Sequence, residues 1–163
     1  MKRPRPEAVA IGLGALAAAL LIGALGFQYL ARLAPCEMCV WQRWPHLAAA
    51  TVGLLGGGAV SAGLLARPTA RPIAVVTALL VGISGMIAIY HAGVEWHWWK
   101  GPSQCTGSAF QLGGKLDLNA PVAMCDRAAW RLFGLSLAGY NALVSLAAAA
   151  IGLILAARAR TTA

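Results

Sequence analysis

Four long stretches of the sequence contain no charged residue, and they constrain the fold more than any other feature. They cover residues 8–31, 44–66, 72–94 and 132–157, which are 24, 23, 23 and 26 residues long. About 20 apolar residues in a helix suffice to cross the hydrocarbon core of a bilayer. The stretches lack the polar alternation of a barrel strand, and lipid cannot satisfy exposed backbone groups. We therefore expect an all-α integral membrane protein, a four-transmembrane-helix bundle that forms a single domain over residues 1–163.

The overall composition agrees with a membrane protein. Of the 163 residues, 60% are hydrophobic and 11% are charged, whereas soluble domains contain about 25% charged residues. Too few charged side chains are present to cover a water-facing surface. This composition excludes a disordered chain and a small disulfide-rich secreted protein. It also argues against a nucleic-acid partner, although the net charge is +8.

The basic residues explain this charge, because they mark one side of the membrane. Seven of them lie in the two chain ends and in the turn between the second and third stretches: Lys2, Arg3, Arg5, Arg67, Arg71, Arg158 and Arg160. The longer connectors, residues 32–43 and 95–131, hold the other six. Basic residues stay on the cytoplasmic side, so both termini should be cytoplasmic and both longer connectors should face outward. The first stretch exceeds the about 7 to 15 residues of a signal-peptide core, so we expect it to remain as a span.

Several small, polar and aromatic residues have ordinary structural explanations. Gly53 and Gly57 form a GxxxG motif, which allows two helices to approach closely. Asn141 is expected to form a hydrogen bond with a neighbouring helix. A tryptophan group follows the third stretch, where an aromatic belt at the membrane interface is expected: Trp96, Trp98 and Trp99.

All four cysteines lie in the two outward connectors. They are Cys36 and Cys39 in the first connector, and Cys105 and Cys125 in the second. Cysteines that merely filled space would be scattered through the apolar spans. In an oxidising outer compartment two disulfides are expected, and the simplest of the three possible pairings joins Cys36 to Cys39 and Cys105 to Cys125.

The two bridges differ in what they can do. A bridge between Cys105 and Cys125 closes a long loop and would contribute about 3 kcal/mol to stability in the chain-entropy model. A bridge between Cys36 and Cys39 encloses two residues and constrains very little, so redox chemistry is its more plausible use. Two such pairs that face each other would form a relay for thiol–disulfide exchange.

The residues around the CxxC pair favour a reactive thiolate. Pro35 suits the first turn of a helix, whose N-terminal dipole stabilises a thiolate. Arg43 follows Cys39 by four residues and would lie on the same helix face as both cysteines. Pro45 should break or bend this helix shortly afterwards.

Two alternatives for the cysteines remain open. Four cysteines could bind a zinc ion, although zinc sites usually supply a second close pair and an oxidising compartment disfavours free thiolates, so we expect no metal site. The protein could also be a non-catalytic membrane scaffold with structural disulfides.

Taken together, these features resemble the disulfide bond formation protein B (DsbB) family of bacterial inner-membrane thiol oxidases. The resemblance covers the whole chain: the four spans, the termini on the inner side and a second cysteine pair in the long outer connector. Its motifs are Pro35-Cys36-Glu37-Met38-Cys39, the trailing Arg43, the segment Tyr90–Trp96 with His91, and Gly134-Leu135-Ser136.

The resemblance implies a quinone-dependent protein-disulfide oxidoreductase. It would reoxidise a soluble periplasmic thioredoxin-fold oxidase of the DsbA type and pass two electrons to a membrane quinone, either ubiquinone or menaquinone. The cysteine pairs would then lie on the periplasmic side of the inner membrane. The partner's thiolate would attack Cys105, Cys125 would attack Cys36, and Cys39 would be left as a thiolate.

The resemblance also assigns residues to a quinone site. Arg43 would donate a hydrogen bond to a quinone oxygen and stabilise the Cys39 thiolate, and His91 would help to form the pocket. Without the resemblance, Arg43 and His91 would be simple interface residues. Family members commonly have an acidic residue before this arginine, whereas this chain has Gln42.

Another enzyme family remains as an alternative. Quinone-linked thiol oxidoreductases of the vitamin K epoxide reductase type are also small helical bundles with a CxxC motif. In that family the motif lies late in the chain, whereas Cys36 and Cys39 precede the second span. The order of the elements therefore favours the DsbB resemblance.

Overall fold

The computed structural model of the chain describes residues 4–102, 105 and 124–159. Its helices and strands are, in order, α1 (Pro6–Tyr29), α2 (Glu37–Thr51), the π-helix η1 (Val52–Gly56), α3 (Gly57–Ser61), the 3-10 helix η2 (Arg67–Thr69), α4 (Ala70–Glu95), β1 (Arg131–Leu132), β2 (Leu135–Ser136) and α5 (Leu137–Arg158). Four of the basic residues and part of the second outward connector lie outside the described residues: Lys2, Arg3, Lys115, Arg160 and residues 103–104 and 106–123.

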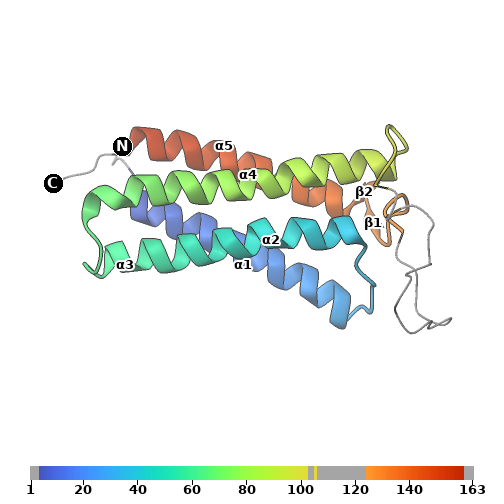
Figure 1. Ribbon diagram of the computed structural model, residues 1–163, viewed down its shortest axis with the longest axis horizontal. Helices are drawn as coiled ribbons and strands as arrows, with labels where there is room; N and C mark the ends of the chain where they lie inside the picture. Colours follow the sequence, from blue (N-terminus) through green and yellow to red (C-terminus); the bar gives the residue numbers. More distant parts are fainter. Residues whose placement is uncertain (1–3, 103–104, 106–123, 160–163) are drawn as a thin grey trace.

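The helices form an elongated bundle in which the first expected outward connector and the described parts of the second lie at the same end (Figure 1). The start of α1, the end of α5 and the turn between α3 and α4 lie at the opposite end. A core cluster at that opposite end joins α1, α4 and α5 through Val9, Ala10, Ala74 and Ala156. Small side chains at these contacts allow the helix backbones to pack closely.

Within the described residues, three helical segments are long and apolar enough to cross a membrane, namely Pro6–Tyr29, Arg67–Glu95 and Leu137–Arg158. The second column of the bundle, which follows α1 in the chain, consists of α2, η1 and α3, and these follow one another without a gap. Helix α2 has only 15 residues and includes the polar side chains of Gln42, Arg43 and His46. The second column is thus interrupted and more polar than the three longer apolar segments.

The break expected at Pro45 is not found. Helix α2 continues through Pro45 to Thr51, and the irregular segment is the π-helix that follows at Val52–Gly56. Pro45 has no N–H, so the carbonyl four residues earlier loses its helical donor. Helices packed among neighbours in a membrane tolerate this loss better than isolated helices.

The last helix begins later than the uncharged stretch at 132–157 indicated. Residues Arg131–Leu132 and Leu135–Ser136 form an antiparallel hairpin instead, so the chain is not purely helical. The turn residues Phe133 and Gly134 have φ of 47° and 82°, as in the two-residue turns that suit a hairpin. Ser136 then caps α5, because its Oγ accepts a hydrogen bond from the Gly139 N–H at 3.1 Å.

The GxxxG motif lies at the contact between the second column and α1. A Cβ atom on Gly53 would lie 2.5 Å from the carbonyl oxygen of Ala10 and 2.8 Å from the Cα of Gly14. On Gly57 it would lie 2.8 Å from the side chain of Ile11. The helix-packing role predicted for both glycines is therefore confirmed.

Candidate functional site

Cys36 and Cys39 lie at the start of α2. Cys36 is the N-cap residue, and its Sγ accepts a hydrogen bond from the backbone N–H of Cys39 at 3.2 Å. Pro35 therefore precedes the cap, whereas the sequence analysis expected it in the first turn of the helix. The sulfur of Cys36 takes the place that a hydroxyl or carboxylate oxygen usually fills at the positive end of a helix.

The two thiols of this pair are free and in contact. Their Sγ atoms lie 2.7 Å apart, so the disulfide expected between them is not formed. The hydrogen bond from Cys36 lowers the pKa of Cys39, and the nearby charge of Arg43 lowers it further, while burial opposes both effects. The same hydrogen bond, together with burial, raises the pKa of Cys36. Of the two thiols, Cys39 is therefore the one that ionises more readily.

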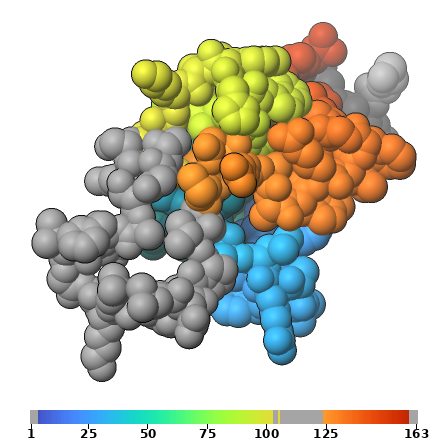
Figure 2. Space-filling model, turned by 90° about the vertical axis from the view of Figure 1, so that its right-hand side faces the viewer, coloured from blue at the N-terminus to red at the C-terminus, as the bar shows by residue number. Residues whose placement is uncertain are grey.

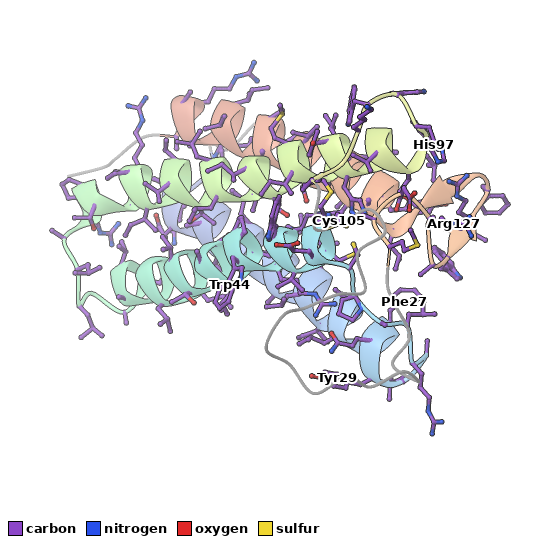
Figure 3. All side chains as sticks on the ribbon, turned by 45° about the vertical axis from the view of Figure 1, so that its right-hand side comes forward. Phe27, Tyr29, Trp44, His97, Cys105 and Arg127 are labelled. Atoms are coloured by element: carbon purple, nitrogen blue, oxygen red, sulfur yellow. A yellow bond between two sulfur atoms is a disulfide. The ribbon has the colours of Figure 1, made fainter. Side chains whose placement is uncertain are left out.

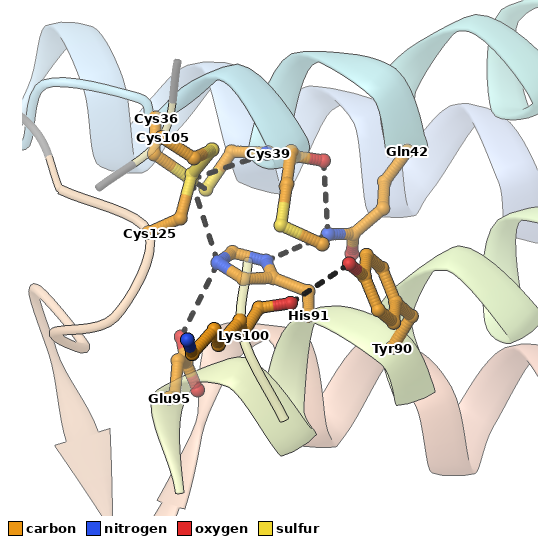
Figure 4. Close-up of a disulfide and its surroundings, with 10 residues drawn as sticks. Cys36, Cys39, Gln42, Tyr90, His91, Glu95, Lys100, Cys105 and Cys125 are labelled. Atoms are coloured by element: carbon orange, nitrogen blue, oxygen red, sulfur yellow. Dashed lines mark hydrogen bonds and ion pairs between the residues drawn. A yellow bond between two sulfur atoms is a disulfide. The ribbon is translucent and has the colours of Figure 1, made fainter. Parts of the chain in front are cut away.

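The second cysteine pair packs directly against the first. Cys105 and Cys125 form a disulfide, as the simplest pairing predicts, and the N–H of Cys125 donates to the carbonyl of Cys105 at 3.0 Å. Cys36, Cys105 and Cys125 belong to one buried cluster, and Cys39 packs against it. Figure 4 shows the four cysteine side chains close to one another, beside the ring of His91. Cysteines from two separate connectors thus form one site.

The connector end of the bundle holds this site. In Figure 2, which views that end, the end of α4 and the segment from residue 124 to α5 lie side by side, with the end of α1 beneath them. Cys105 lies between α4 and the start of α2 in Figure 3, whereas Tyr29 and Trp44 project away from the bundle. The disulfide is therefore held among the helix ends.

His91 connects the cysteines to a buried hydrogen-bond network. It lies on α4 and is 3% exposed, with Nε2 at 3.4 Å from Cys36 Sγ and 3.7 Å from Glu95 Oε1. Its Nδ1 lies 2.9 Å from the side-chain nitrogen of Gln42 on α2. One imidazole therefore contacts the reactive cysteine pair on one side and the interior of the bundle on the other.

The network continues across the bundle to α5. The side-chain nitrogen of Asn141 donates to Gln42 Oε1 at 2.8 Å and to Ser84 Oγ at 3.2 Å. Asn141 Oδ1 lies 2.9 Å from His46 Nε2 and accepts from Ser145 Oγ at 2.7 Å. The predicted hydrogen bond between Asn141 and a neighbouring helix is confirmed, and it joins α5 to both α2 and α4.

Arg43 reaches from α2 toward α1. Its Nη1 donates to Gln28 Oε1 at 2.5 Å. Its Nε is buried and has no hydrogen-bond partner among the residues that the structure describes. An unpaired buried N–H is costly, so this donor is available to a ligand oxygen.

Two cavities meet at Cys39 and His91. One has a volume of about 260 Å³ and is lined by α1, α2 and α5, including Phe27, Arg43 and Asn141. The other, of about 440 Å³, lies toward the connectors and includes Cys36, Glu95 and Arg127 among its lining residues. Both cavities are lined by Cys39 and His91. A ligand in the first cavity could therefore reach Cys39 without passing the disulfide.

The chain that carries this site is similar to known proteins over most of its length. The family model described as disulfide bond formation protein DsbB matches residues 6–155. The chain belongs to the DsbB family. DsbB family membership makes it a membrane protein of disulfide bond formation and identifies its chemistry as that of a disulfide oxidoreductase. It favours neither the vitamin K epoxide reductase type nor a non-catalytic scaffold.

Two DsbB relatives show how far the similarity extends. A disulfide bond formation protein B from Polaromonas sp. (strain JS666 / ATCC BAA-500) is 27% identical over 150 residues, which cover 86% of this chain and 84% of the relative. One from Pasteurella multocida (strain Pm70) is 34% identical over 127 residues, which cover 70% of this chain and 65% of the relative. No solved structure matches the chain.

Cys36, Cys39 and His91 also have the composition of a partial metal site. Their ligand atoms all lie within 4.8 Å of one another. The zinc site considered from the sequence would need thiolates from both pairs, but Cys105 and Cys125 are joined in a disulfide. A thiolate and a disulfide sulfur are not equivalent ligands, so a four-cysteine site does not fit this arrangement.

The sequence analysis singled out the cysteines, Arg43 and His91, and these residues do come together. It missed the contributions of Gln42, His46, Ser84 and Glu95 to the site. A usable signal was present, because polar residues within apolar spans usually face one another and mark functional regions.

Proposed function

We propose that the chain is a membrane thiol oxidase that reoxidises a DsbA-type periplasmic thioredoxin-fold protein and passes two electrons to a membrane quinone. The main support is a single observation: the Cys105–Cys125 disulfide packs against Cys36, whose partner Cys39 lines a separate cavity with Arg43. Such contact is what exchange between two cysteine pairs requires.

The exposed surface and the order of the elements support a placement in the membrane. We propose four spans, the second at about residues 44–66 along α2, η1 and α3, with both termini on the cytoplasmic side of a bacterial inner membrane and with Cys36 and Cys39 in the outer connector. Large apolar side chains are exposed along the bundle, including Ile22, Leu55 and Met86 at 68%, 70% and 60%. Exposed tryptophans follow α4 at the connector end, as expected of a membrane interface: Trp96, Trp98 and Trp99.

The proposed steps are thiol–disulfide exchanges, so the sulfur atoms together neither gain nor lose electrons. A partner thiolate attacks Cys105, which forms a mixed disulfide and releases Cys125 as a thiolate. Cys125 then attacks Cys36 of an oxidised Cys36–Cys39 pair, so the Cys36–Cys125 bond forms and Cys39 leaves as a thiolate. Each step makes one sulfur–sulfur bond and breaks one. The lowered pKa of Cys39 makes it the better leaving group of its pair.

The smaller cavity is where the chain's residues fit a quinone. Cys39, Arg43 and His91 would hold the ring, and the unpaired Nε of Arg43 offers a donor for a ring oxygen. A cavity of about 260 Å³ is near the lower limit of ligand pockets, so it suits a ring whose apolar tail remains in the bilayer. A bound quinone supplies the acceptor for two electrons and two protons. The positive charge of Arg43 stabilises negative charge on Cys39 and on the ring oxygen.

Turnover of purified protein in lipid nanodiscs tests this proposal. With a reduced DsbA-type partner and a water-soluble quinone, we expect one quinol to form for each partner disulfide. Cys36→Ser and Cys39→Ser should both abolish quinol formation. If either variant keeps the wild-type rate, the proposed route is wrong, and if the wild type forms no quinol, quinone is not the acceptor.

A further inference from the structure

The side-chain amide of Gln42 is held in one orientation by its neighbours. Its nitrogen donates to the carbonyl oxygen of Met38 at 3.1 Å, and a carbonyl can only accept. Its oxygen accepts from the side-chain nitrogen of Asn141 at 2.8 Å. Asn141 is oriented in turn by Ser145, whose hydroxyl donates to its oxygen at 2.7 Å. The amide nitrogen of Gln42 therefore faces His91.

This orientation decides which nitrogen of His91 carries the proton. The Gln42 nitrogen lies 2.9 Å from His91 Nδ1, and an amide nitrogen donates but does not accept. In a neutral ring Nδ1 must then hold the lone pair, and Nε2 must carry the proton. We propose that Gln42 is a positioning residue that fixes His91 in the Nε2–H tautomer, with this N–H directed at the sulfur of Cys36.

The contacts of Nε2 agree with this assignment. Cys36 Sγ lies 3.4 Å from Nε2 and Glu95 Oε1 lies 3.7 Å from it. Both of these atoms can accept a hydrogen bond. Figure 4 shows the imidazole between Gln42 on one side and Cys36 with Glu95 on the other. The side chains of Gln42, Cys36, Glu95 and His91 are each at most 6% exposed.

The tautomer matters for the step in which Cys36 leaves a disulfide; this consequence rests on the proposed function. The partner's second thiolate first attacks its own cysteine in the mixed disulfide, so the oxidised partner leaves and Cys105 is released as a thiolate. Cys105 then attacks Cys125 in the Cys36–Cys125 bond, the Cys105–Cys125 bond forms again and Cys36 departs as a thiolate. His91 Nε2–H can donate a charge-assisted hydrogen bond to that thiolate. A lone pair at Nε2 would repel it.

The same tautomer opposes metal capture by the reduced cysteine pair. A histidine binds a metal through an unprotonated nitrogen, and its other N–H usually donates to a carboxylate or carbonyl. The 3.4 Å between Cys36 Sγ and His91 Nε2 is close to the separation of two zinc ligands, with bonds of about 2.3 and 2.0 Å. Gln42→Glu keeps the side-chain length but replaces the donor by an acceptor. This variant should move the proton to Nδ1 and leave Nε2 free to bind zinc.

Nitrogen-15 NMR of histidine-labelled, reduced full-length protein measures the tautomer directly. The chain has three histidines, and His91→Gln identifies the His91 signals. At a pH where the ring is neutral, we expect the wild type to show the proton on Nε2 and Gln42→Glu to show it on Nδ1. Gln42→Leu, which neither donates nor accepts, should give a mixture. A wild-type His91 with the proton on Nδ1 would overturn the proposal.

Zinc binding to the same reduced proteins gives a second readout. Competition with a chromophoric chelator should show that Gln42→Glu binds zinc about 10 to 100 times more tightly than the wild type, as expected when the partner of a ligand histidine changes. Equal affinities would contradict the proposed control of the tautomer. Neither readout needs quinone or a protein partner, so a negative result here is distinct from a failure of the proposed oxidase activity.

Discussion

The Sγ atoms of Cys36 and Cys39 lie 2.7 Å apart, yet the two sulfurs face different surroundings. Cys36 belongs to the buried cluster that contains the Cys105–Cys125 disulfide. Cys39 lines the smaller cavity together with Arg43, whereas Cys36 does not. The pair thus spans the boundary between sulfur exchange on one side and a ligand cavity on the other.

The first prediction concerns the order in which these thiols ionise. The pKa of Cys39 is lowered, first by the hydrogen bond from Cys36, so its thiolate should persist to lower pH than that of an ordinary thiol. The pKa of Cys36 is raised, so Cys36 should remain protonated under the same conditions. Mass spectrometry after alkylation with iodoacetamide across a pH series should show Cys39 modified first.

A matched variant tests whether the hydrogen bond from Cys36 is the cause of the lowered pKa of Cys39. Cys36→Ala removes the hydrogen bond, so alkylation of Cys39 should then require a higher pH. If Cys36 is modified first in the wild type, the assignment of the thiolate is reversed.

The second prediction tests Arg43 as a ligand residue. Arg43→Met keeps the apolar stem but removes the donor and the charge beside the cavity. A hydrogen bond to a charged group contributes about 1.5–3 kcal/mol, which corresponds to a roughly 10- to 100-fold rise in the KM for quinone. Gln28→Leu, which removes only the partner of Arg43 Nη1, should have a smaller effect. An unchanged KM in Arg43→Met would remove Arg43 from the site.

The third prediction concerns the stability of the polar network. Asn141→Leu removes bonds to Gln42, Ser84 and Ser145 and leaves buried polar groups unsatisfied. The free energy of unfolding should fall by about 1–3 kcal/mol. Thermal unfolding in nanodiscs should show a lower Tm, whereas Phe133→Ala at a side chain that is 92% exposed should leave it near the wild-type value. Equal Tm values for the wild type and Asn141→Leu would show that the network adds nothing to stability.

Two glycines on the second column provide a fourth prediction. A Cβ on Gly53 would clash with the backbone of α1, whereas a Cβ on Gly58 meets nothing within 4 Å. Gly53→Ala should therefore lower the Tm. Gly58→Ala should keep or raise it, because alanine favours a helix over glycine by about 0.8–1.0 kcal/mol. The opposite order would mean that α1 does not pack on this column as described.

Three long apolar helices and the grouping of the cysteines could be predicted from the sequence because they depend on composition and local spacing. Long uncharged stretches indicate α1, α4 and α5, and the short distance between Cys36 and Cys39 indicates a reactive pair. Hydrophobicity could not distinguish the hairpin formed by β1 and β2 from helix, because a two-residue turn depends on backbone angles. Local propensity also overstated the effect of Pro45, which the packed helix tolerates.

The hydrogen-bond partners within the polar network could not be predicted, because they come from three different helices. Gln42, His91 and Asn141 are far apart in the chain, and only the packing of α2, α4 and α5 brings them within hydrogen-bonding distance. The substitution of Gln42 for the usual acidic residue was visible in the sequence. Its effect on His91 depends on the direction of the hydrogen bonds between Gln42 and its neighbours. Only the folded structure shows which neighbours these are.

The relay from the Cys105–Cys125 disulfide to the Cys36–Cys39 pair is the central claim, and one trapped species tests it most directly. A partner variant that retains only its attacking cysteine should stop the reaction after the first exchanges. Peptide mapping by mass spectrometry should then find the partner joined to Cys105, a Cys36–Cys125 disulfide and a free Cys39. A complex in which Cys125 is free and Cys36 remains bonded to Cys39 would contradict the relay.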